Sequence, residues 1–178
     1  MNLSLLRNLV FLCPLAMIIG CNDSPKVSQA GSVETKASSS GETTFTFPNG
    51  PVTVSIPVSG TVRLEAGDTV VVSPPSDSSI TLRFNLHGLP GLDAEEFLLA
   101  QSKSKGLEIT RIGGKASLSE MGTRSEGDIQ YDMTFWQIAF GDSLVVMSAE
   151  VESDRASDPV VKEFIAAIPE IIESMAKE

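Results

Sequence analysis

Apolar and polar residues alternate along much of the chain between residues 44 and 86. Every second residue is apolar in Thr44–Phe47, Val52–Ile56 and Ile80–Leu86. Two further short stretches, residues 61–65 and 69–73, flank an Ala-Gly-Asp sequence that is typical of a tight connection. Alternation with a period of two is typical of half-buried strands. The first half of the chain is therefore predicted to be mostly β-sheet.

A helix is predicted from Asp93 to about Lys105. Asp93 stands at the N-cap position and Glu96 follows three residues later, as in a capping box. At the other end, the positive charge of Lys105 suits the helix dipole, and Gly106 can adopt the left-handed conformation that ends a helix.

Strand patterns resume after this helix. Residues 107–112 and 115–120 flank Gly113-Gly114, which predicts a two-residue hairpin turn with positive φ angles. Residues 128–140 and 144–151 alternate again around a Gly-Asp turn. This part of the chain is predicted to be an antiparallel meander.

The last predicted helix begins after Asp158, with Pro159 at the first helical position. Its apolar residues recur at helical spacing: Val161, Phe164, Ile165, Ile168, Ile172 and Met175. Pro169 has no amide proton, so we expect the helix to kink or restart there.

Together these elements predict an α+β fold. One globular domain, residues 44–178, would consist of an antiparallel β-sheet packed by two helices at about residues 93–105 and 159–176. Residues 22–42 are rich in serine and small or charged residues and contain no leucine or aromatic residue. We expect residues 21–43 to form a flexible linker, because they cannot bury enough apolar area to fold.

The order of elements from Val52 to Ala176 resembles the fold shared by PsbP, DcrB, LpqN and a Ran-binding nuclear import factor. The most similar part is the hairpin sequence YDMTFWQIAFGDSLVVMSAEV followed by FIAAIPEIIESM. This resemblance implies an accessory, docking or carrier protein rather than an enzyme, and it transfers no functional residue because the group has no diagnostic motif. The opening strands also fit a cystatin-like or sandwich domain.

The first 20 residues have the layout of a cleaved signal peptide. One charged residue, Arg7, precedes an apolar run from Leu9 to Ile19, which is shorter than the roughly 20 residues that a membrane-spanning helix needs. The run ends in Ile18-Ile19-Gly20-Cys21, which resembles the lipobox of bacterial lipoproteins. The resemblance implies a lipid on Cys21. An ordinary secretory leader or an uncleaved anchor is the alternative.

A lipid on Cys21 predicts a domain held at a membrane of the bacterial cell envelope. The linker would keep it within about 25 Å of the surface. Asn22, rather than Asp, follows Cys21, and in enteric bacteria this resembles an outer-membrane signal facing the periplasm. Cys13 is the other cysteine and leaves with the leader, so we expect no disulfide.

The chain is strongly acidic. Its formal charge is −10, and loss of Arg7 with the leader would make it −11. Such a surface repels nucleic acid and anionic lipid headgroups, so we expect no nucleic-acid partner. The acidity is interpreted mainly as a contribution to solubility.

Few residues suit catalysis or metal binding. His87 is the only histidine, and it lies in a predicted strand end without a G-x-S-x-G motif, so a loop histidine is favoured over a general base. The S-x-x-K spacing from Ser102 to Lys105 is weak evidence for a nucleophile, since its companion motifs are missing. We expect no catalytic residue, cofactor or metal site built on nitrogen or sulfur.

Acidic residues near 126–132 and 150–154 leave a calcium site open. Oxygen ligands from the two groups would meet if these strand ends are adjacent: Glu126, Asp128, Asp132, Glu150, Glu152 and Asp154. The alternative interpretation is a solvated sheet edge on which charge prevents pairing with other strands.

Trp136 lies in Phe135–Phe140, where both faces of the strand are largely apolar. We expect burial on both faces, with an aromatic-lined pocket or docking patch as the alternative. The sequence favours a lipid-anchored, non-catalytic domain that binds an envelope protein or an apolar ligand. The alternatives are an envelope hydrolase that uses His87 or acidic residues, and an immunity or inhibitor protein.

Overall fold

The computed structural model describes residues 35–37, 42–75 and 79–177. The predicted leader, Cys21 and most of the predicted linker lie outside the described residues. Thr35–Ala37, which the sequence placed in the linker, form strand β1 and pair with β2, Thr43–Thr46. Strand pairing uses backbone groups and does not require apolar side chains, so composition did not reveal this strand.

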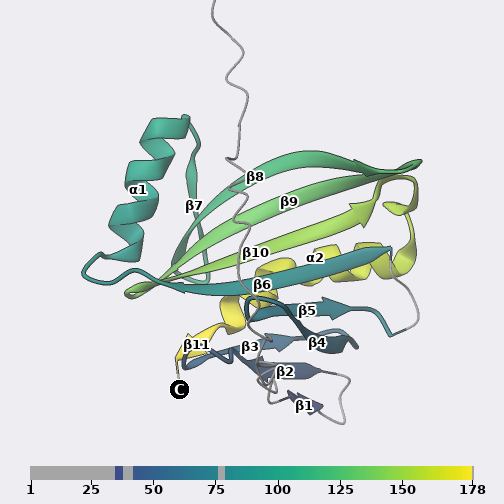
Figure 1. Ribbon diagram of the computed structural model, residues 1–178, viewed down its shortest axis with the longest axis horizontal. Helices are drawn as coiled ribbons and strands as arrows, with labels where there is room; N and C mark the ends of the chain where they lie inside the picture. The colour runs from purple at the N-terminus through teal and green to yellow at the C-terminus, as the bar shows by residue number, and fades with distance from the viewer. Residues whose placement is uncertain (1–34, 38–41, 76–78, 178) are drawn as a thin grey trace, which may run out of the picture.

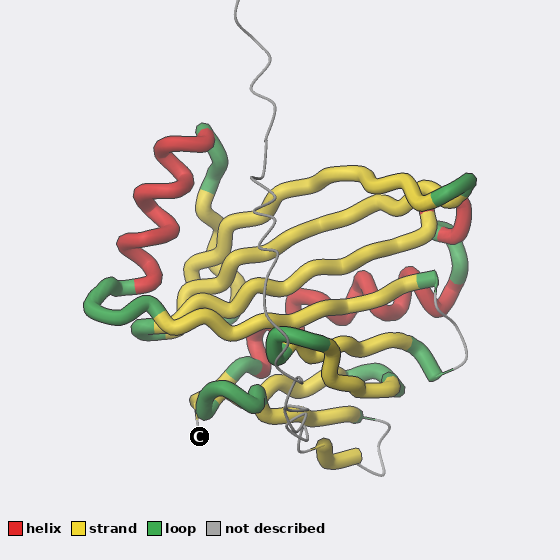
Figure 2. The backbone as a smooth tube through the Cα atoms, in the orientation of Figure 1, coloured by secondary structure: helices red, strands yellow, loops and turns green. Residues whose placement is uncertain are grey.

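The strands form two antiparallel sheets (Figures 1 and 2). The smaller sheet has the order β1-β2-β3-β11 and the larger has the order β4-β5-β6-β10-β9-β8-β7. The remaining strands are β3 (Val52–Ile56), β4 (Thr61–Glu65), β5 (Thr69–Ser73), β6 (Ile80–Gly88), β7 (Ile109–Ile112), β8 (Lys115–Glu126), β9 (Ile129–Phe140), β10 (Ser143–Glu152) and β11 (Ala176–Lys177). With two helices on these sheets, the predicted α+β class is confirmed.

Helix α1, Ala94–Lys105, has the predicted ends. The Asp93 carboxylate accepts the backbone N–H groups of Glu95 and Glu96 at 2.9 and 3.0 Å. Gly106 ends the helix with φ 68°, and its N–H bonds the Ser102 carbonyl. The capping residues in the sequence therefore located this helix correctly.

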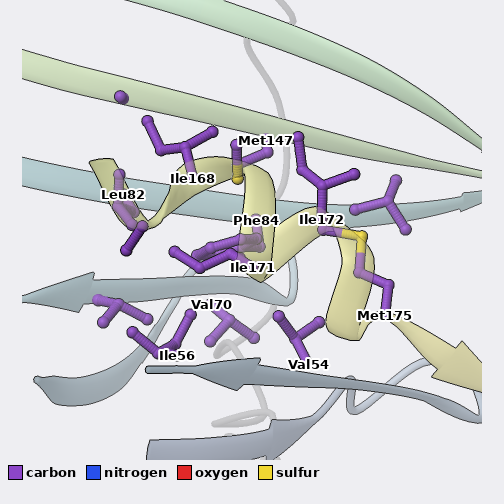
Figure 3. Close-up of a cluster of buried hydrophobic side chains, with 14 of the residues drawn as sticks. Val54, Ile56, Val70, Leu82, Phe84, Met147, Ile168, Ile171, Ile172 and Met175 are labelled. Carbon is purple, nitrogen blue, oxygen red and sulfur yellow. The ribbon is translucent and has the colours of Figure 1, made fainter. Parts of the chain in front are cut away.

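Helix α2, Pro159–Ser174, forms the centre of the main core (Figure 3). Its apolar side chains pack among residues from β3, β5, β6 and β10, as Figure 3 shows for Ile168, Ile171, Ile172, Val54, Ile56, Val70, Leu82, Phe84 and Met147. The helix continues through Pro169 without a break, so the predicted restart is wrong. Buried residues on both sides of the proline, Ile168 and Ile171, hold the helix against the core despite the lost backbone bond.

The β8–β9 hairpin is longer than the sequence predicted. Strand β8 was expected to end at Glu120, but it extends to Glu126 and turns at Gly127, with φ 60°, into β9. The additional residues are exposed and do not alternate, so only their pairing with β9 defines them as a strand.

The larger sheet presents one face to α2 and the other to α1. Along β9, Ile138 and Trp136 pack against the main core around α2, whereas Ala139 packs against the smaller core that includes Leu98 of α1. Because successive side chains alternate between faces, Thr134 and Asp132 also face the α2 side. Within the described ranges, no helix is long and apolar enough to cross a membrane.

Candidate functional site

An apolar pocket of about 370 Å³ opens between α2 and strands β9 and β10. Its volume lies at the lower end of the range for ligand pockets, roughly 300–1,000 Å³. Ten residues line it: Ile112, Asp132, Thr134, Trp136, Ala149, Val151, Ala156, Ile165, Ile168 and Pro169.

The floor of the pocket follows from the register of β9 and β10. Thr134 pairs with Ala149, and Asp132 pairs with Val151. Ala149 is small, so the floor stays open where a longer side chain would fill it. Along β9, side chains pass from buried Ile138 through half-buried Trp136 to exposed Asp132. The pocket therefore extends from the core towards the outer end of the sheet.

One wall of the pocket is the face of α2 next to its buried stripe. Ile168 is buried there, but Ile165, which the sequence grouped with the buried residues, is 43% exposed. Ile165 differs because it points into the open pocket and not into the core. Pro169 lies one turn later and has no amide proton. The Ile165 carbonyl beside this wall therefore lacks the backbone hydrogen bond that it would accept in an ordinary helix.

The turn between β7 and β8 packs against the end of α2 and positions Ile112 at the pocket. Gly113 and Gly114 have φ angles of 55° and 78°, which confirms the predicted turn. A Cβ atom on Gly113 would lie 3.0 Å from the Cα of Glu173, so glycine is required for this approach. Lys115 Nζ donates to the Glu173 carbonyl at 3.0 Å. Partial burial lowers the pKa of Lys115, and the Glu173 carboxylate opposes this shift.

Asp132 is the only ionisable residue that lines the pocket. It is exposed at the outer end, next to the hydroxyl-bearing Thr134. The remaining lining residues are apolar or, in Trp136, aromatic with one N–H donor. The site can hold an apolar group and offers few polar contacts.

The residues that the sequence singled out for catalysis lie elsewhere. His87 is exposed near the end of β6 and does not line this pocket. The Ser102 hydroxyl donates to the Leu99 carbonyl, and Lys105 pairs with Glu120 at 2.6 Å. The helix end thus explains the S-x-x-K spacing.

Glu126 and Glu150, one from each acidic group, both pair with Arg124. Glu150 pairs with Arg83 at 3.1 Å and with Arg124 on the sheet face opposite to α2, whereas Asp132 faces α2. Asp154 lies in a short 3₁₀ helix, Ser153–Arg155, and not on the strand. Within the described part of the chain, no three His, Cys, Asp or Glu residues are grouped as metal ligands. The two strand ends do meet, but an arginine lies between Glu126 and Glu150 on one face of the sheet, and Asp132 lies on the other face.

Trp136 is half-buried, so the expectation of burial on both faces is wrong. Its neighbour Phe135, on the other face, is 37% exposed. The sequence indicated a pocket at Trp136 only as the alternative. The open floor of the pocket depends on the pairing of Thr134 with Ala149, and this pairing of residues distant in sequence could not be predicted. The small residue at position 149 within an apolar strand was the available signal.

No protein-family model matches the chain. No curated protein matches it either.

Solved structures do match the chain. A protein from Bacteroides thetaiotaomicron is similar over 72% of this chain, with 13% identity and a TM-score of 0.55. The chain spans 45% of the length of that protein. At this identity, the similarity concerns the fold alone.

Two other matches are proteins of the group that the sequence resembles. LpqN of Mycobacterium tuberculosis, involved in cell envelope biogenesis, is 15% identical, with 72% of this chain and 84% of LpqN covered and a TM-score of 0.45. Cyanobacterial PsbP from Synechocystis is 13% identical, with 93% and 99% covered and a TM-score of 0.33. These low scores add no argument about function.

Proposed function

We propose that this protein is a non-catalytic binding domain of the bacterial cell envelope, held at a membrane by a lipid on Cys21. Its binding site is the pocket beside Trp136, which takes an apolar group of a small ligand or of a partner protein. The main support for this proposal is the pocket lining, because nine of its ten residues have no ionisable group. Burial of an apolar group there is favourable at roughly 25 cal/mol per Å².

The lining of this pocket does not bring together two groups of the kind that catalysis needs. Acid–base and nucleophilic catalysis need a reactive group within hydrogen-bond reach of a second group that activates it. Asp132 stands alone as an ionisable group in the lining, and His87 is not part of it. An envelope hydrolase therefore receives no specific support from this site.

The envelope location rests on the leader and on Ile18-Ile19-Gly20-Cys21. We expect mass spectrometry of the mature protein to find acyl groups on an N-terminal Cys21, and Cys21→Ala to abolish the modification. A wild-type protein without acyl groups would refute the anchor without touching the pocket.

Binding can be followed through Trp136, because it is the only tryptophan in the chain. N-phenyl-1-naphthylamine is a neutral apolar probe that fluoresces in apolar surroundings and accepts energy from tryptophan. We expect the probe to quench Trp136 saturably while its own emission rises. A linear, non-saturating response would contradict binding in a defined pocket.

The pocket itself is tested with Ile165→Glu and a matched control, Leu99→Glu. Both residues are apolar, lie on helices and are 43% exposed, but only Ile165 lines the pocket. We expect Ile165→Glu to weaken probe binding at least about tenfold, because an apolar occupant would bury a carboxylate. Leu99→Glu should bind as the wild type does. If the two changes weakened probe binding equally, the probe would not bind in this pocket, and the proposed binding site would be wrong.

A further inference from the structure

Strand β8 has a long unpaired edge. Strand β7 pairs with β8 only from Lys115 to Leu118. The next eight residues, Ser119–Glu126, pair with β9 on one side, and no described strand pairs with them on the other (Figure 1). These residues therefore present backbone N–H and C=O groups along the rim of the larger sheet.

This edge lacks several features that prevent strands from pairing. Ser119–Glu126 contains no proline and no lysine, and its register with β9 is unbroken, without a bulge. Met121 is 87% exposed on it. The charges on the edge have both signs: Glu120, Arg124 and Glu126. Glu120 also pairs with Lys105, and Arg124 pairs with Glu126 and Glu150, so an approaching strand would share these charges with their partners in the chain and would meet free backbone groups.

We propose that two copies of this chain pair through β8, antiparallel, about a two-fold axis at Gly122. In this register Glu120 of each copy lies opposite Arg124 of the other, and Met121 lies opposite Thr123. Both contacts occur twice because of the symmetry. Opposite charges in directly facing positions stabilise a strand pair, and like charges destabilise it.

The neighbouring symmetric registers are less favourable. An axis at Thr123 places Glu120 opposite Glu126, and an axis at Arg124 places this residue opposite itself. An axis at Met121 places Arg124, Ser125 and Glu126 opposite Leu118, Ser117 and Ala116, which already pair with β7 on that side, whereas the axis at Gly122 places only Glu126 there. Charge and the end of β7 therefore select the axis at Gly122.

The pairing also extends the sheet face on which Trp136 lies. A two-fold axis perpendicular to the sheet leaves both α2 helices on the same face. Ser119, Met121 and Thr123 lie opposite Trp136, Thr134 and Asp132 of β9 and face the same way. In the dimer these rows from the two copies become neighbours, so the second copy's β8 contacts Met121 along one side.

The association is weak in solution. A single strand pair buries less than the roughly 1,200–2,000 Å² of a stable interface. The formal charge of −10 on each chain adds repulsion, which salt screens beyond about 8 Å at physiological ionic strength. Covalent capture is therefore the suitable assay.

Gly122→Cys tests the pairing in whole bacterial cells that produce the full chain. Paired Cβ atoms are about 4.5–5.5 Å apart, so a short, membrane-permeant bis-maleimide can join them. Gly88→Cys is the control, because Gly88 is also an exposed strand glycine with open space around an added Cβ. The native cysteines are common to both variants and to the wild type.

A band at twice the mass of the chain should be several-fold stronger for Gly122→Cys than for Gly88→Cys and the wild type. Equal bands would overturn the proposal. A Gly122→Cys product with a different protein would also overturn it, in favour of a foreign strand at this edge. The readout needs no ligand, so it is independent of the pocket.

Charge reversal tests the register. In the Gly122→Cys background, Glu120→Arg places two arginines opposite each other, and Arg124→Glu places two glutamates opposite each other. Each variant alone should cross-link less, whereas a mixture of the two differently tagged variants should form the mixed dimer preferentially. Circular dichroism checks that each variant is folded. Cross-linking of either variant with itself at the parental level would refute the axis at Gly122.

Discussion

The ammonium group of Lys115 donates to the Glu173 carbonyl oxygen across 3.0 Å and joins the β7–β8 hairpin to the C-terminal end of α2. The contact satisfies one of the last carbonyl groups of the helix, which lack intrahelical donors. Because Ile112 precedes the same turn, the contact also positions a pocket residue.

Gly113→Ala should destabilise the protein more than Gly114→Ala. Both residues have positive φ, which costs an alanine roughly 1–2 kcal/mol. Only at Gly113 would the new Cβ meet Glu173, whereas Gly114 has open space. Urea unfolding followed by Trp136 fluorescence should give a difference of about 1 kcal/mol or more between the variants. Equal losses would show that α2 yields to the added methyl group.

Lys115 should titrate at a lower pH than an exposed lysine, because burial lowers its pKa from the ordinary 10.5. The unfolded chain then holds this proton more tightly than the folded chain does. Between the folded pKa and 10.5, Lys115 therefore makes the free energy of unfolding increase as the pH rises. This stabilisation is lost as the pH falls through the folded pKa. NMR titration of the lysine side chains, assigned with Lys115→Met, measures the shift. A value of 10.5 or above would contradict the burial.

Ala149→Leu should abolish binding of the naphthylamine probe at little cost in stability. The added side chain enters the open floor of the pocket, so the free energy of unfolding should change by less than about 1 kcal/mol. Ala94→Leu is the comparison, because Ala94 is fully buried in α1 and lines no part of this pocket. Overpacking there should cost about 1–3 kcal/mol. Unchanged probe binding in Ala149→Leu would place the probe elsewhere.

Arg83 and Glu150 should show a favourable coupling free energy in a double-mutant cycle with alanine. Their side chains meet at 3.1 Å, and that of Glu150 is only 11% exposed. We expect a coupling of about 0.5–1 kcal/mol that falls as salt is added. Arg124 is the second partner of Glu150, whose hydrogen bond and charge raise the pKa of Arg124. A coupling of zero at low salt would mean that solvent screens the pair.

Local sequence signals predicted most of the fold. Asp93 and Gly106 located the ends of α1, Pro159 located the start of α2, and Gly113-Gly114 located a hairpin turn. Each of these signals acts through backbone bonds or φ angles within a few residues. The spacing of apolar residues in β6 likewise predicted its buried face.

Long-range pairing decided what the sequence could not predict. The second half of β8 is exposed throughout, and only its contact with β9 makes it a strand. The pocket needs the register of β9 with β10, the position of α2 and the β7–β8 turn, which bring together residues from 112 to 169. The sequence identified Trp136 as unusual, but its surroundings depend on these distant segments.

The row Ile138, Trp136, Thr134 and Asp132 on β9 runs from the core to the mouth of the pocket on a single strand. Its inner end is constrained by the packing of α2, whereas its outer end contacts solvent or a ligand. Substitutions at positions 132 and 134 therefore disturb less packing than substitutions at positions 136 and 138. The mouth of the pocket can thus change in polarity while the core that supports it keeps its packing.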